Sequence, residues 1–129
     1  MDSATGRKTI GSVVKAFDVI ELLASVDCDL GVTEIGNRLD AGVSATYHLM
    51  ATLNMLRVVE QDPDTKKYRL GLRLWAIGER AKERNHLISH FRPYLKRIRD
   101  VTGETTNLTF LDGNEIIYVA QEEIGRAHV

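Results

Sequence analysis

The sequence contains one cysteine, Cys28, so no disulfide bond can form within the chain. It has no run near the roughly 18 consecutive apolar residues that a membrane helix requires. Residues 1–10 also lack the apolar core of a secretory signal. From these absences we expect a cytoplasmic protein in a reducing compartment, with no membrane partner.

Neither sign of charge is in excess. The chain has 17 Lys and Arg against 18 Asp and Glu, and a formal net charge of −1. Residues 1–75 hold 9 cations and 10 anions, and residues 76–129 hold 8 of each. A DNA-binding interpretation therefore has to rest on where the cations lie and not on their sum.

Residue patterns that carry catalysis are lacking too. The sequence has no Gly-rich phosphate loop, and no Ser-His-Asp or paired-carboxylate constellation stands out. His86 and His90 have the spacing of one helix face, but no third ligand completes a metal site. Cys28 has no evident base beside it. We therefore expect no enzyme activity, no cofactor and no metal site.

What the sequence does contain begins with a polar segment and an amphipathic helix. Residues 1–11 are polar and include glycine, which predicts a flexible arm. Apolar residues then recur at steps of three and four, which predicts a helix over 12–25 with Ser12 as its N-cap.

Two further helices follow, joined by a tight turn. Thr33 is the predicted N-cap of a helix over 33–39, and Ser44 caps a third helix over 45–56 after the turn at 40–43. The predicted inward positions of the third helix are Thr46, Leu49, Met50, Leu53 and Leu56, and the outward ones are Ala45, Tyr47, His48, Ala51 and Thr52. This spacing is typical of a helix-turn-helix.

A hairpin comes next. Residues 58–61 and 67–70 have the composition of two strands, and Asp-Pro-Asp-Thr at 62–65 has that of a turn. Three helices followed by a hairpin within about 60 residues predict a winged helix.

The remaining residues predict two helices and a second hairpin. A long helix is expected over 72–91, and Pro93 fits the first turn of another helix that ends near Gly103. Strands are expected over 106–111 and 115–121, around an Asp-Gly-Asn turn. The fold class is therefore α+β and mainly helical.

A winged helix places the start of its third helix at base edges in the major groove of DNA. The predicted DNA-contacting residues on that helix are Ser44, Ala45, Tyr47, His48 and Thr52. The wing offers Lys66, Lys67 and Arg69 to phosphates, and Thr33 lies at a helix N-terminus, where a phosphate is stabilised.

Each of these features also has a simpler interpretation. Lysines in a turn are solvated in most proteins, and polar residues on a helix are more often surface residues than base readers. Some winged helices bind only protein, so a protein-interaction or dimerisation module without DNA binding is the alternative. Salt dependence separates the two, because phosphate contacts weaken steeply as salt rises.

At these residues the chain resembles the IclR family of bacterial transcription regulators. The stretches that carry the resemblance are SVVKAFDVIELLA (12–24), LGVTEIGNRL (30–39), VSATYHLMATLNML (43–56), DPDTKKYRLGLRLWAIG (62–78) and HFRPYLKRIRDVTGETTNLTFLDGNEIIYVAQEE (90–123). The Tyr-Arg-Leu-Gly run at 68–71 is the most specific of them. The resemblance implies a homodimer on a pseudo-palindromic operator, or a tetramer when full length. It also implies a small organic effector bound in a C-terminal GAF-like domain.

The resemblance divides the chain into an arm (1–11), a winged helix-turn-helix (12–71), a linker helix (72–91) and the truncated start of an effector domain (92–129). Many relatives have a proline near Gly42, a threonine at Ala45 and an arginine at His48, so the operator sequence is expected to differ. Residues 124–129 match a translated sequencing adapter, and the hypothesis is that they are artefactual.

Overall fold

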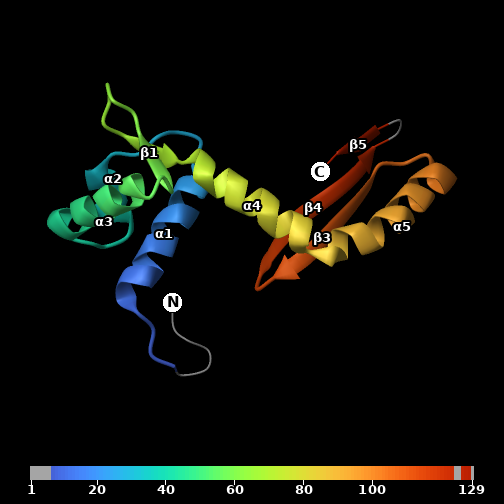
Figure 1. The fold of residues 1–129 in the computed structure, drawn as a ribbon, viewed down its shortest axis with the longest axis horizontal. Coiled ribbons are helices and arrows are strands. Elements are labelled where there is room, and N and C mark those ends of the chain that lie inside the picture. Colours follow the sequence, from blue (N-terminus) through green and yellow to red (C-terminus); the bar gives the residue numbers. More distant parts are fainter. Residues whose placement is uncertain (1–6, 124–125, 129) are drawn as a thin grey trace. The chain divides into compact units, whose positions relative to one another are not determined.

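The computed structural model describes residues 7–123 and, for the backbone alone, residues 126–128. The chain forms two compact units, one up to Ile77 and one from Gly78 onward, and α4 (Leu72–Arg84) carries the chain from the first to the second (Figure 1). Residues 1–6 of the predicted arm lie outside the described residues, as do the side chains of the final six residues.

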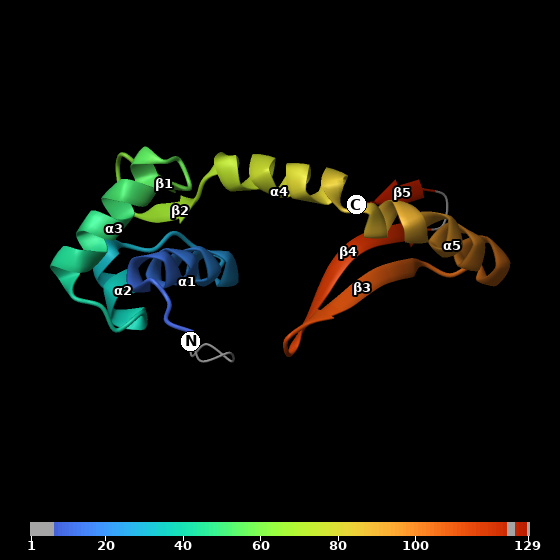
Figure 2. The same cartoon turned by 60° about the horizontal axis from the view of Figure 1, so that its bottom comes forward.

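Three helices and a two-stranded hairpin make up the first unit. The helices are α1 (Gly11–Ser25), α2 (Val32–Arg38) and α3 (Val43–Met55), and the strands are β1 (Val59–Gln61) and β2 (Tyr68–Leu70) (Figures 1 and 2). The residues that share one buried core are Val19, Leu23, Leu30, Ile35, Met50, Leu53, Val59 and Tyr68. Every element of the unit contributes to this core, which confirms the winged helix-turn-helix.

The predicted helix caps at Ser12, Thr33 and Ser44 are wrong. Helix α1 begins at Gly11, and Gly31 and Gly42 are the N-caps of α2 and α3. The Glu34 carboxylate accepts the Gly31 amide at 3.1 Å, so the N-cap of α2 lies two residues before Thr33 and a side chain from the first turn binds the N-cap backbone.

The inward face of α3 is shorter than predicted. Thr46, Met50 and Leu53 are buried, whereas Leu56 is 44% exposed because the helix ends at Met55. Helix α2 approaches this face closely. A Cβ on Gly36 would lie 3.0 Å from the Thr46 hydroxyl oxygen, so residue 36 has to be small for the two helices to pack at this distance.

The wing has a third strand-like partner. Strands β1 and β2 pair antiparallel, with Val59 opposite Leu70 and Gln61 opposite Tyr68. On its other edge β2 pairs with Leu30: the Leu30 amide donates to the Tyr68 carbonyl at 3.0 Å, and the Tyr68 amide donates back at 2.7 Å. The connection between α1 and α2 is therefore part of the wing sheet.

The second unit contains one long helix against a three-stranded sheet. Helix α5 (His86–Thr102) is followed by β3 (Thr106–Asp112), β4 (Glu115–Glu123) and β5 (Arg126–His128), which pair antiparallel in that order. The hairpin between β3 and β4 confirms the predicted Asp-Gly turn, with Gly113 at φ 60°.

The prediction of one helix over 72–91 is wrong. Asn85 separates α4 from α5, and its side-chain oxygen accepts the Leu87 amide at 3.0 Å, which caps α5. The prediction that Pro93 begins a helix is wrong for the same reason, since Pro93 lies inside α5. Helix α5 begins directly after its N-cap Asn85, so it is already under way before it reaches Pro93.

Within the second unit, α5 and β4 are joined by a buried ion cluster. Glu122 is 0% exposed, and its two carboxylate oxygens lie 2.6 Å from the guanidinium of Arg92 and 3.2 Å from that of Arg99. Arg99 also binds Asp100 at 2.9 Å. Two arginines of α5 thus neutralise one carboxylate of β4, next to the buried side chains of Leu95 and Ala120.

Candidate nucleic-acid interface

The outward face of α3 is polar and uncharged. Ser44, Ala45, Tyr47, His48 and Thr52 are all exposed, as predicted from the sequence, while α3 buries its opposite face in the core. The Tyr47 and His48 rings lie with their centroids 5.9 Å apart and their planes at 78°, so they form an edge-to-face pair.

Two of these side chains have additional contacts within the protein. The Thr52 hydroxyl donates to the His48 carbonyl at 2.9 Å, which leaves its oxygen free to accept a hydrogen bond. Ala45 lines a cavity of about 180 Å³ between α1 and α3, beside Lys15 and Leu49. Lys15 donates to the Leu39 carbonyl at 2.7 Å and so ties α1 to the end of α2.

Two tyrosines, Tyr47 on the outward face of α3 and Tyr68 on the wing, influence each other electrostatically. Tyr68 of β2 is buried, and burial raises the pKa of its phenol above the ordinary value; nearby Tyr47 raises it further. Tyr47 is itself 57% exposed. The exposed phenol of α3 and the buried phenol of β2 therefore interact electrostatically.

Lys66 and Lys67 are the exposed cations at the tip of the wing. Lys66 has φ 63°, in the left-handed region, and its carbonyl accepts the Gln61 side-chain amide at 3.0 Å. The Lys67 ammonium lies 4.0 Å from the Glu34 carboxylate, and both side chains are about half exposed. This long, solvated ion pair is weak, and it brings the wing to the start of α2.

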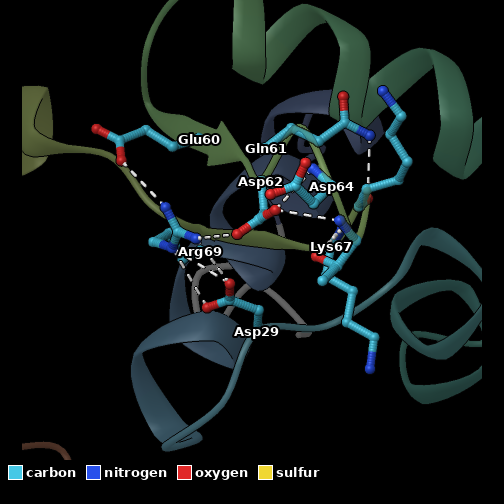
Figure 3. A network of polar contacts seen from close by, with 9 residues as sticks. Asp29, Glu60, Gln61, Asp62, Asp64, Lys67 and Arg69 are labelled. Atoms are coloured by element: carbon cyan, nitrogen blue, oxygen red, sulfur yellow. Dashed lines mark hydrogen bonds and ion pairs between the residues drawn. The ribbon is translucent and has the colours of Figure 1, made fainter.

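Arg69 has different surroundings from the two lysines. Its guanidinium contacts three carboxylates, those of Asp29, Glu60 and Asp62 (Figure 3). Hydrogen bonding to Asp29 is the largest cause that raises the pKa of Arg69, followed by the charges of Asp29 and Asp62. The structure therefore brings Arg69 to acidic residues that were not predicted to belong to the site.

Asp62 also organises the turn of the wing. Its Oδ1 atom accepts the Asp64 amide at 2.8 Å and the Thr65 amide at 3.1 Å. These two backbone hydrogen bonds lower the pKa of Asp62, and the charge of Arg69 lowers it further. An aspartate at the first position of a turn commonly accepts hydrogen bonds from the backbone amides that follow it, so the Asp-Pro-Asp-Thr sequence was enough to predict these contacts.

The start of α2 is already occupied by an acidic side chain. Thr33 is exposed at the second position of α2, and Glu34 accepts the Gly31 amide at the helix N-terminus. The contacts of Glu34 with Gly31 and Lys67 were not predicted from the sequence.

Metal-ligand clusters and membrane-spanning helices are both lacking among the described residues. Within residues 7–123, no three His, Cys, Asp or Glu side chains come together as metal ligands. No described helix combines the length and apolar character needed to cross a membrane.

Three helices closed by a two-stranded wing define the winged helix-turn-helix class of proteins. Within that class, the IclR helix-turn-helix domain model matches residues 12–63, and the model of the bacterial transcriptional regulator IclR C-terminal domain matches residues 79–128. The chain belongs to the IclR family.

Relatives and solved structures agree with this assignment. The HTH-type transcriptional regulator BhcR of Paracoccus denitrificans is 34% identical over 114 residues, which cover 88% of this chain and 40% of BhcR. An IclR transcriptional regulator from Alicyclobacillus acidocaldarius has a TM-score of 0.75 at 28% identity, over 95% of this chain and 50% of that one. The fold is also that of an IclR family regulator from Brucella abortus, with a TM-score of 0.84 at 14% identity over 96% and 48% of the two chains. This chain therefore spans half or less of the length of these relatives.

Proposed function

We propose that this chain is the DNA-binding part of a transcription regulator of the IclR type, which inserts α3 into the major groove of a double-stranded operator. The observation that supports this best is the combination of an exposed, uncharged polar face on α3 with the exposed wing cations Lys66 and Lys67 in one compact unit. The absence of carboxylates from α3 leaves that helix free of repulsion toward DNA phosphates.

On α3, each exposed side chain has a proposed role. Tyr47 and His48 form hydrogen bonds to base edges, and Ala45 contacts a thymine methyl group. The Ser44 hydroxyl binds a base edge or a phosphate, and the Thr52 hydroxyl, whose proton goes to the His48 carbonyl, accepts from a base-edge amino group. Helix α3 has no arginine or lysine, the side chains that most often recognise guanine. Sequence-dependent shape of the operator therefore supplies part of the specificity.

The proposed phosphate contacts come from the wing and from α2. Lys66 and Lys67 bind the DNA backbone, and the exposed Thr33 hydroxyl contributes from the start of α2. DNA binding releases Lys67 from its weak pair with Glu34. These contacts set affinity and orientation, and they act alike on all sequences.

We further propose that the regulator acts as a homodimer on a pseudo-palindromic operator. Val13 and Phe17 of α1 are 62% and 59% exposed, and Leu72 and Trp75 of α4 are 75% and 68% exposed. Several large exposed apolar side chains on one protein favour an interface with a protein partner, here a second copy of the chain. A small organic effector and a tetramer are proposed only for a protein as long as the relatives, through the domain that begins at residue 79.

The test uses the purified chain and DNA duplexes selected from a random-sequence pool, with fluorescence anisotropy measured from about 50 to about 200 mM salt. We expect His48→Ala to weaken binding to the selected sequence by about 1–3 kcal/mol and to leave binding to mixed-sequence DNA unchanged. Lys67→Ala weakens binding to both kinds of DNA alike. It also lowers the slope of log binding constant against log salt concentration by about 0.9, the value for one phosphate contact.

Met55→Ala is the matched control, since Met55 is 74% exposed at the far end of the same helix. Equal losses on selected and mixed-sequence DNA for both His48→Ala and Lys67→Ala contradict the division between base and phosphate contacts. A chain that dimerises but enriches no DNA from the pool is a protein-interaction module, and the proposed function is then wrong.

A further inference from the structure

The strand register explains why Arg69 is surrounded by acid. Arg69 is the middle residue of β2, and its direct cross-strand partner on β1 is Glu60. On the other edge of β2, Tyr68 pairs with Leu30, which places Asp29 beside Arg69. Asp62 follows Glu60 by two residues and so belongs to the same face of the hairpin. Three carboxylates thus reach Arg69 from two segments of chain, the α1–α2 connection and β1 with the start of its turn.

All three nitrogens of the guanidinium are engaged (Figure 3). Nε and Nη2 lie 3.2 and 3.0 Å from Oδ2 of Asp29, Nη2 lies 3.1 Å from Oδ2 of Asp62, and Nη1 lies 3.8 Å from Oε2 of Glu60. The planar guanidinium donates in a fixed fork, so these contacts fix its orientation as well as its charge. A DNA phosphate at Nε or Nη2 would have to displace one of these partners, and at Nη1, which makes no hydrogen bond, it would approach the Glu60 carboxylate.

We propose that Arg69 is a positioning residue for DNA binding. It ties the α1–α2 connection at Asp29 to both wing strands, and it thereby holds Lys66 and Lys67 in place without contacting DNA itself. This inference rests on the proposed function, and it gives Arg69 a role different from that of the neighbouring lysines.

From the charges around Arg69 we expect its removal to weaken the wing. Three carboxylates face one guanidinium, so without Arg69 they repel one another and the segments that carry them lose their common partner. Asp64 lies on the same wing but has no contact with Arg69 among those described, and its backbone amide binds Asp62 instead. Asp64 therefore serves as a control with the same charge and a different neighbour.

The first test needs no DNA. Amide hydrogen exchange is measured at Asp62 and Lys66, whose amides donate to the Lys67 and Asp62 carbonyls at 2.8 and 2.9 Å. We expect Arg69→Met to speed exchange at both amides by about threefold or more, and Lys67→Met to leave the Asp62 amide unchanged. Unchanged exchange in Arg69→Met overturns the positioning role.

The second test is a double-mutant cycle on DNA binding, with Asp29→Asn as the milder variant that keeps Arg69 and the strand pairing. We expect Arg69→Met to weaken binding about three- to tenfold with the salt slope unchanged. In the Asp29→Asn background its effect is about threefold smaller. In the Asp64→Asn background its effect is the same as in the unmodified chain.

If Arg69 contacts DNA directly, the expected changes in affinity and in salt slope are different. Asp29→Asn would then free the guanidinium and tighten binding more than Asp64→Asn does, and Arg69→Met would lower the salt slope by about 0.9. Either result overturns the inference. If the unmodified chain binds no DNA, the proposed function fails, and the exchange rates still decide whether Arg69 holds the wing.

Discussion

Gly71 lies directly against the carbonyl oxygen of Arg57. A Cβ on residue 71 would overlap that oxygen and would also lie 3.0 Å from the Val58 carbonyl oxygen, while the Gly71 amide donates to Val58 at 2.8 Å. The chain therefore leaves the wing and enters α4 in contact with the backbone that follows α3. A residue without a side chain is the one that fits here, which accounts for the glycine in the Tyr-Arg-Leu-Gly run.

We expect Gly71→Ala to lower the free energy of unfolding by about 1–3 kcal/mol, because backbone has to move to admit the methyl group. Urea denaturation followed by circular dichroism measures the change. Gly78→Ala is the control: nothing lies within 4 Å of a Cβ there, and alanine in α4 adds helix stability of up to about 1 kcal/mol. Equal effects of the two substitutions would contradict the close approach at Gly71.

Met50 is 0% exposed in the core of the first unit. Met50→Ala leaves a cavity between α3 and its neighbours, and we expect a loss of about 2–5 kcal/mol in the free energy of unfolding. Met55→Ala, five residues later on the same helix and 74% exposed, changes it by less than about 0.5 kcal/mol. A small loss for Met50→Ala would mean that the three-helix core is not packed as described.

The turn of the wing depends on the charge of Asp62. The Thr65 and Asp64 amides lower the pKa of Asp62 below its ordinary value in the folded state. The stability that these contacts supply is therefore fully present above the ordinary pKa of 3.8, and it is lost as pH falls through the lower folded value. Carboxyl NMR titration should show this depressed pKa, and Arg69→Met should raise it only in part. A full return to the ordinary value in Arg69→Met would contradict the primary role of the backbone amides.

Glu122 balances two arginines in a site from which its own side chain has no access to water. Glu122→Gln leaves Arg92 and Arg99 without their shared counter-charge, and we expect the second unit to lose about 3 kcal/mol of stability. Hydrogen exchange of β4 amides measures this loss. Glu115→Gln, at the exposed start of β4, has no such effect, and similar exchange in both variants would show that the buried cluster is not stabilising.

The sequence predicted the first unit well where local patterns and packing agree. Residues such as Ile35, Met50 and Leu53 recur with a helical period, and Asp-Pro-Asp-Thr marks the hairpin without further information. The helix caps were missed because the three helices begin after residues without a capping side chain, Ile10, Gly31 and Gly42, and Glu34 of α2 binds the Gly31 amide instead. The break at Asn85 was missed because apolar residues continue at helical spacing on both sides of it.

The candidate site divides in the same way. Exposure of Tyr47, His48 and Lys66 follows from the helical period and the turn, so a single sequence is enough to predict it. The environment of Arg69 depends on strand register and on Asp29, which is 40 residues away in the sequence. The spacing of a single arginine in the sequence does not indicate such a partner. The contacts of Arg69 with Asp29, Glu60 and Asp62 could therefore be found only from the structure.

The pairing of Leu30 with Tyr68 makes the two connections of the first unit unequal in how they can vary. Residues added at the tip, beside Pro63, disturb the Asp62 turn contacts but leave the pairing of β1, β2 and Leu30 in place, whereas residues added near Leu30 shift Asp29 out of register with Arg69. The tip should therefore tolerate insertion better than the α1–α2 connection does. The α1–α2 connection can be transplanted into another scaffold only together with β2.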